Sequence, residues 1–208
     1  MYTLWENLKL AKAYRWAELS RPVCGDGCGT CETHINFPAH AIPGAEQSGD
    51  YTVDDLVFPL CVIDISEKTA ADPSCTVTVD DIRAYEAEYG PIPDEAFVAL
   101  KSMRGDDMPE TGSPDTAEEQ KKRPSGWSPE ALRYIFEERD ASAAGQQTGN
   151  DGPDDPECLN YMLGKGKLQV CFLGDLDPAA PAGAVILVSY PKIEDAAQLP
   201  ARVWLITE

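Results

Sequence analysis

The alternation of strand-like and helix-like segments is the feature that most constrains the fold of this chain. Leu56–Ile65 (LVFPLCVIDI) is an apolar, β-branched run, and Phe97–Leu100 is a second, shorter one. Between them, Thr78–Tyr89 has a threonine N-cap, an aspartate at the third helical position and Gly90 as a stop. Strands that alternate with helices predict an α/β fold, with a mixed β-sheet layer flanked by helices.

Further segments extend this pattern over the whole chain. Apolar spacing predicts a helix over 3–19, and Ser128 followed by Pro129 predicts the start of another that runs to residue 139. One helical turn with Thr52 as its cap is expected over 51–56. The remaining strands are expected at 141–145, 168–173, 184–190 and 201–207.

The chain has 208 residues, which is enough for one domain with a core, so residues 1–208 are expected to form a single domain. Residues 1–22 are interpreted as an N-terminal helical arm that could contact a partner subunit. Two long acidic stretches, 104–126 and 149–157, are predicted to be loops.

The charge balance excludes some classes of partner. The chain has 36 acidic and 17 basic residues, a net charge of −19, whereas contact with nucleic-acid phosphates or anionic lipid needs excess lysine and arginine. Residues 1–16 mix charges into their apolar positions, so neither a signal peptide nor a membrane span is expected. Seven cysteines, an odd number, then favour reduced thiols and a cytoplasmic location.

The only two histidines of the sequence lie close together, in residues 32–44 (ETHINFPAHAIPG). His34 and His40, with Asn36 between them and Pro38 shaping the turn, could direct several side chains into one cleft. In metal hydrolases such groups bind a divalent ion, which lowers the pKa of a bound water and polarises a carbonyl. From the spacing alone, two unrelated surface or core histidines are the alternative.

The same segment resembles the signature of the cyclase family of hydrolases, H-x-G-T-H-x-D-x-P-x-H, at Thr33, His34, Pro38 and His40. The similarity continues through residues 50–100, 126–139, 173–192 and 201–206. This family includes kynurenine formamidases and isatin hydrolases. The resemblance therefore implies metal-dependent hydrolysis of an amide, a formamide or a cyclic lactam, and a homodimer or higher homo-oligomer.

The departures from this signature change the expected chemistry. The family's first histidine falls at Thr30, its glycine at Glu32 and its aspartate ligand at Asn36. Downstream, residues 146–148 (QQT) replace a His-Glu-Thr-like stretch, and Cys171 replaces a glutamate. Neutral amide groups and a hydroxyl are weak metal ligands, and they do not offset the charge of a divalent ion. We therefore expect weakened metal binding.

We therefore predict a small-molecule enzyme with a re-tasked, metal-poor pocket and no required cofactor. Histidine-based acid–base chemistry would act on a carbonyl or cyclic substrate by cyclisation, dehydration, isomerisation or hydrolysis. His40 is the predicted acid or base, because imidazole titrates near neutral pH, and His34 is its partner or an electrophile. The candidate substrate-binding residues are Thr30, Asn36, Phe37, Trp127, Gln146 and Cys171.

Two alternatives stay open. A divalent metal could be kept by His34, His40 and Cys171, or by the Cys24–Cys31 loop, whose C-x3-C-x2-C spacing is also found in iron–sulfur motifs. Cys171 could also be a nucleophile with a histidine as its base. In the other alternative, the chain is a non-catalytic binding or scaffold protein that has kept only the fold.

Overall fold

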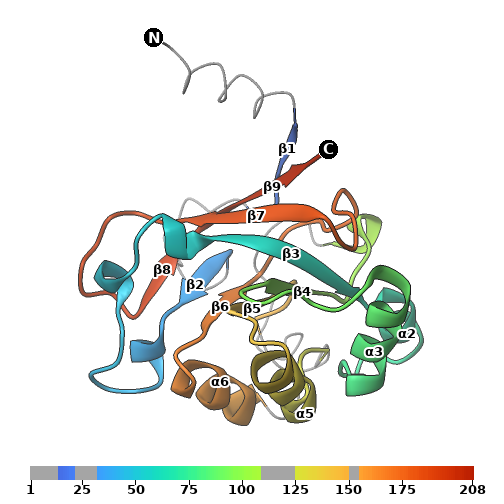
Figure 1. Cartoon of the computed structure of the whole chain (residues 1–208), viewed down its shortest axis with the longest axis horizontal. Helices are drawn as coiled ribbons and strands as arrows, with labels where there is room; N and C mark the ends of the chain where they lie inside the picture. Colours follow the sequence, from blue (N-terminus) through green and yellow to red (C-terminus); the bar gives the residue numbers. More distant parts are fainter. Residues whose placement is uncertain (1–13, 22–31, 109–124, 150–154) are drawn as a thin grey trace.

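The computed structural model describes residues 14–21, 32–108, 125–149 and 155–208 (Figure 1). Nine strands among these residues form one curled sheet in the order β1-β9-β7-β3-β4-β5-β6-β2-β8. The central run from β3 to β6 is parallel, and the other pairings are antiparallel. The strands are β1 (Arg15–Glu18), β2 (His34–Asn36), β3 (Val57–Asp64), β4 (Phe97–Lys101), β5 (Ala143–Gln146), β6 (Leu168–Cys171), β7 (Ala184–Ser189), β8 (Gln198–Pro200) and β9 (Arg202–Thr207).

The longer helices gather on one side of this sheet, where Figure 1 shows α3, α5 and α6 together. One core fills the inside of the curl, and a second core lies between the parallel strands and these helices. This arrangement confirms the predicted α/β fold with a mixed sheet flanked by helices. The described helices are α2 (Ser66–Ala71), α3 (Val79–Tyr89), α5 (Pro129–Arg133), its π-helical continuation η5 (Tyr134–Glu138) and α6 (Asp155–Gly164), with short 3-10 turns η1 (Pro38–His40), η2 (Ser48–Asp50), η3 (Asp54–Leu56) and η4 (Gly105–Asp107).

Local capping chemistry fixes helices α3 and α5 where the sequence predicts them. Thr78 Oγ1 accepts a hydrogen bond from the Asp81 backbone N–H at 3.3 Å, and Asp81 Oδ2 accepts one from the Thr78 N–H at 2.9 Å. Gly90 ends the helix with φ of 95°, a value that favours glycine. Ser128 caps α5 in the same way, by accepting from the Ala131 N–H.

Two expectations about the chain are wrong where the structure describes it. The predicted helix over 3–19 is a strand at Arg15–Glu18, because these residues pair with β9. The predicted loop 149–157 ends early, since α6 begins at Asp155 and buries Cys158 and Met162 against the sheet. Residues 1–13 and 150–154 lie outside the described part, so the helical arm stays a prediction there.

Strands β2 and β8 and helix α2 are elements that the sequence did not predict. In the described part of the chain, no helix combines the length and the apolar character that crossing a bilayer requires.

Candidate active site

A row of polar side chains crosses three neighbouring strands on the helix-covered face of the sheet. The β2–β6 register places His34 opposite Cys171 and Asn36 opposite Gln169. The β5–β6 register pairs Gly145 with Val170, which brings the next residue, Gln146, level with Cys171. Because side chains alternate along a strand, all five lie on one face, whereas Ile35 and Val170 enter the inner core. We call His34, Asn36, Gln146, Gln169 and Cys171 the polar row; all five are buried.

His34 is held in one tautomer within this row. Its Nδ1 lies 2.7 Å from the Glu32 carbonyl oxygen, which can only accept, so Nδ1 carries the proton and Nε2 keeps a lone pair. Burial lowers the pKa of His34 below its ordinary value; the Glu32 carbonyl opposes this shift, and the charge on His40 adds to it. The ring is therefore neutral at pH 7, and its Nε2 can accept a proton or a hydrogen bond.

The amides of the row have unused hydrogen-bonding capacity. Asn36 Nδ2 donates to Gln169 Oε1 at 2.7 Å and lies 3.9 Å from Cys171 Sγ. Asn36 Oδ1 and both amide atoms of Gln146 are buried without a hydrogen-bond partner among the described residues. Each such atom costs about 1–3 kcal/mol unless a ligand or an ordered water satisfies it. These amide atoms could therefore form hydrogen bonds with a polar ligand.

The residue that follows Cys171 has an unusual backbone conformation, which no pattern in the sequence predicts. Phe172 has φ of 54°, in the left-handed region that non-glycine residues rarely adopt. Its backbone N–H donates to the Thr148 carbonyl at 3.2 Å, and its carbonyl accepts from Thr33 Oγ1 at 2.5 Å. Its ring leaves no room for a Cβ at Gly149, where the closest atoms would be 2.3 Å apart. The surroundings therefore lock a strained residue at the end of β6.

The other predicted site residues lie outside the polar row. His40 is exposed in η1 and affects His34 only through its charge. Phe37 belongs to the inner core, where its ring packs against Tyr51 and Tyr190 at centroid distances of 5.5 and 5.1 Å. Trp127 is buried in the core under the helices, and its Nε1 has no partner among the described residues.

Neighbouring positions of the same motifs have structural roles or fall outside the described residues. Gln147 Oε1 accepts hydrogen bonds from the backbone N–H groups of Ser102 and Met103 at 2.9 and 2.8 Å, so this side chain ties β5 to the end of β4. Thr30 and the Cys24–Cys31 loop lie outside the described residues. The described cysteines, Cys61, Cys75, Cys158 and Cys171, form no disulfide.

The described side chains do not fit a divalent metal ion. The polar row offers one imidazole, one thiol and three amides but no carboxylate, and the amide nitrogen of Asn36 is the atom near Cys171 Sγ. In the described ranges, no three His, Cys, Asp or Glu side chains gather as metal ligands. Divalent ions in proteins are commonly held by several anionic or imidazole donors, so we derive no step through a metal at this row.

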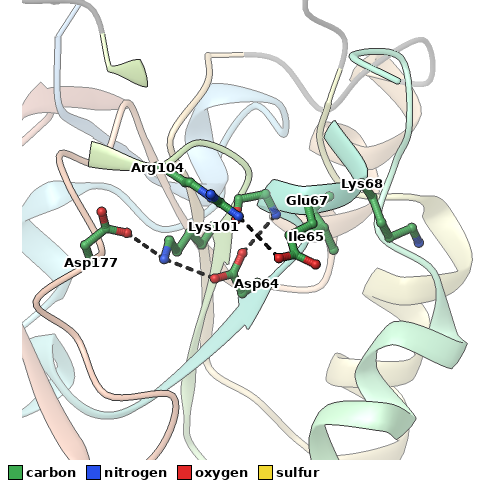
Figure 2. Close-up of a pocket in the computed structure, with 8 residues that line it drawn as sticks. Asp64, Ile65, Glu67, Lys68, Lys101, Arg104 and Asp177 are labelled. Carbon is green, nitrogen blue, oxygen red and sulfur yellow. Dashed lines mark hydrogen bonds and ion pairs between the residues drawn. The ribbon is translucent and has the colours of Figure 1, made fainter. Parts of the chain in front are cut away.

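A separate polar pocket of about 440 Å³ lies where β3 and β4 end (Figure 2). Lys101 Nζ sits between Asp64 Oδ2 and Asp177 Oδ1 at 3.0 and 2.6 Å, and Arg104 pairs with Glu67 at 3.2 Å. These opposite charges largely neutralise one another, which indicates that the ion pairs hold together the chain segments around the pocket. No member of the polar row lines this pocket.

Together, the curled sheet, the helices on one face and the polar row define an α/β protein with a buried candidate site, where the described residues gather no set of three metal ligands. Comparison with known proteins identifies its family. The model of the putative cyclase family matches residues 19–150, more than half of the sequence, so the chain belongs to the cyclase family.

Individual relatives point to one group of hydrolases. The isatin hydrolase of Roseibium aggregatum is 29% identical over 193 residues, which cover 86% of this chain and 71% of that protein. The structure of isatin hydrolase A from Labrenzia aggregata, bound to benzyl benzoate, matches with a TM-score of 0.82 at 19% identity, covering 99% of both chains. The structure of isatin hydrolase A from Ralstonia solanacearum matches with a TM-score of 0.79 at 22% identity, covering 100% of this chain and 98% of that chain. These structural matches confirm the fold.

Proposed function

We propose that this protein is a small-molecule enzyme that hydrolyses the acyl C–N bond of a small cyclic amide by acid–base catalysis. The observation that carries the proposal is a buried, neutral His34 whose Nε2 keeps a lone pair, in one row with Asn36 Oδ1 and the Gln146 amide, which lack partners among the described residues. The similarity to isatin hydrolases, whose named substrate is a cyclic amide fused to an aromatic ring, supports this substrate class.

The chemistry follows from the atoms that the row presents. His34 Nε2 takes a proton from the attacking group while that group bonds to the carbonyl carbon. The carbonyl oxygen gains negative charge, and an amide N–H of the row can donate to it. The imidazolium then gives its proton to the leaving nitrogen as the C–N bond breaks. The net reaction adds one water across that bond and leaves His34 neutral.

This proposal exchanges the roles that the sequence suggested for the two histidines. Removal from water makes a fixed proton acceptor effective, and His34 is buried whereas His40 is exposed. We therefore assign proton transfer to His34 and give His40 an electrostatic role, since its charge lowers the pKa of His34.

The first experiment measures turnover of isatin by the full-length chain, purified without a metal-binding tag, before and after exhaustive treatment with EDTA. We expect ring opening, followed by absorbance, at a rate that EDTA changes by less than about threefold. Elemental analysis of the same preparation supplies the metal content.

Two results would contradict the proposal. Activity that is lost with EDTA and restored by one equivalent of Mn²⁺ or Zn²⁺ would favour the metal-dependent alternative, with Cys171 or the Cys24–Cys31 loop as ligands. No turnover of isatin, of other five- and six-membered lactams or of N-formyl arylamines would favour the non-catalytic alternative.

A further inference from the structure

We propose that Cys171 is the nucleophile of this site and that the reaction passes through a thioester on its Sγ, with His34 as its base and Gln146 as a donor to the oxyanion. This inference rests on the proposed function, because it names the group that attacks the carbonyl. The family position of Cys171 would then have changed from a metal ligand to a covalent catalyst.

The sheet register brings the thiol and the imidazole together. His34 and Cys171 are directly opposite on antiparallel strands, a relation that places Cβ atoms about 4.5–5.5 Å apart on the same face. Thiol nucleophiles need a base at this range, and the fixed Nδ1–H tautomer leaves His34 Nε2 as the accepting atom. Asn36 Nδ2, 3.9 Å from Cys171 Sγ, presents a donor that stabilises negative charge on sulfur.

The backbone strain lies next to the proposed nucleophile. Phe172, with φ of 54°, comes directly after Cys171, at the point where β6 ends. Strained residues are concentrated at functional sites, and in several hydrolases the nucleophile occupies a sharp turn at the end of a strand. The hydrogen bonds from Thr33 to the Phe172 carbonyl and from the Phe172 N–H to Thr148 hold this backbone conformation next to Cys171.

An unpartnered amide lies at the same level of the sheet. Gln146 follows Gly145 on β5 and is level with Cys171 on β6, and its side chain is fully buried with neither amide atom bonded to a described residue. Its Nε2–H₂ group can donate to the oxygen of a tetrahedral intermediate formed on Sγ. The thiol, base and oxyanion donor thus come from three adjacent strands of one rigid sheet.

The reaction balances with water as the only co-reactant. The thiol proton moves to His34 Nε2 as Sγ bonds to the carbonyl carbon. The C–N bond then breaks, its electron pair stays on nitrogen, and His34 returns the proton to that nitrogen. Water, deprotonated by His34, attacks the thioester, the C–S bond breaks, and the thiolate regains the proton. No atom changes its oxidation state overall.

The first test traps the acyl-enzyme by acid quenching during turnover of isatin, and separately of p-nitrophenyl acetate, followed by peptide mass spectrometry. We expect the acyl group on Cys171, and a loss of kcat/KM of about 1,000-fold in Cys171→Ala. Cys75→Ser is the matched control, because Cys75 lies before α3, outside the polar row. Isatin turnover by Cys171→Ala within threefold of wild type, without a trapped thioester, would overturn this inference and leave the proposed function intact.

The second test does not depend on turnover. The rate of alkylation by iodoacetamide is measured for Cys171 and Cys75 in the wild type and in His34→Ala, by peptide mapping. If His34 activates the thiol, the variant alkylates Cys171 about tenfold more slowly, while the rate for Cys75 is unchanged. Equal rates for Cys171 in the two proteins would show that the thiol–imidazole pair is not formed, whatever the substrate.

Discussion

Two consecutive glutamines, Gln146 and Gln147, have different roles at the scale of the residue. Both amide atoms of Gln147 form hydrogen bonds: Oε1 accepts from two backbone N–H groups, and Nε2 donates to the Gly174 carbonyl at 3.2 Å. Gln146, equally buried, has no partner among the described residues. A buried polar group without a partner costs stability, and the function proposed above gives the Gln146 amide a partner in the substrate.

Replacing each glutamine by methionine separates these roles. Gln146→Met removes an unsatisfied amide, so the free energy of unfolding should rise or stay within about 1 kcal/mol while kcat/KM falls at least tenfold. Gln147→Met leaves two backbone N–H groups unpaired and should lower the free energy of unfolding by about 2–3 kcal/mol. Urea unfolding and isatin turnover measure the two effects. The same loss of unfolding free energy in both variants would show that Gln146 and Gln147 do not differ in their contribution to stability.

At the scale of the element, much of the fold could be predicted because its signals are local. The capping box of Thr78 and Asp81, the stop at Gly90 and the apolar run of β3 act within a few residues of each other. β2 could not be predicted in this way, because three residues of mixed polarity become a strand only by pairing with β6 and β8. The polar row depends on that pairing, so the sequence indicated His34, Asn36, Gln146 and Cys171 without their arrangement.

Helix α3 is joined to η5 by a partly buried carboxylate. Glu86 accepts hydrogen bonds from Arg139 Nε at 2.5 Å and from the Tyr134 hydroxyl at 2.8 Å. The Arg139 hydrogen bond lowers the pKa of Glu86, and burial opposes this shift. A carboxyl with a lowered pKa stabilises the fold above its unfolded pKa of about 4.3, and this contribution is lost as the pH falls through the folded value.

The change Glu86→Gln tests this link. We expect a loss of about 2 kcal/mol in the free energy of unfolding at pH 7, because charged hydrogen bonds to Arg139 are replaced by neutral ones. The difference from the wild type should shrink as the pH falls from about 4.3 through the lowered pKa of folded Glu86, below which both side chains are neutral. Urea unfolding between pH 3 and 7 measures it, and a difference that is constant over this range would argue against the ionised carboxylate as the cause.

At the scale of the whole molecule, the outer face of the sheet over β1, β9, β7 and the start of β3 is apolar and open to solvent. The registers of β1, β9, β7 and β3 place Trp16, Ile206, Trp204, Leu187 and Val57 on the same face, and Trp16 and Val57 are 50% and 41% exposed. Glu18 and Arg202 on this face pair at 2.9 and 2.8 Å and cancel each other's charge. In a chain of net charge −19, a neutral apolar face is where a second copy can approach with little repulsion.

The predicted homodimer should therefore use this face. Trp16→Glu would add a buried negative charge on each side of the contact and should give a monomer in sedimentation velocity at micromolar concentration. Tyr89→Glu is the matched control, because Tyr89 is 44% exposed on α3, which lies away from β1 and β9 (Figure 1), and should leave the dimer intact. A monomeric wild type, or a dimer that Trp16→Glu does not weaken, would refute this prediction.

We propose that buried His34, and not exposed His40, transfers the proton in hydrolysis of a cyclic amide. The most direct test compares kcat/KM for isatin in His34→Ala and His40→Ala with that of the wild type, after circular dichroism shows that both variants are folded. We expect a loss of at least about 100-fold for His34→Ala and less than about tenfold for His40→Ala, since general acid–base catalysis contributes about 100- to 10,000-fold. Turnover by His34→Ala within threefold of wild type would contradict this proposal.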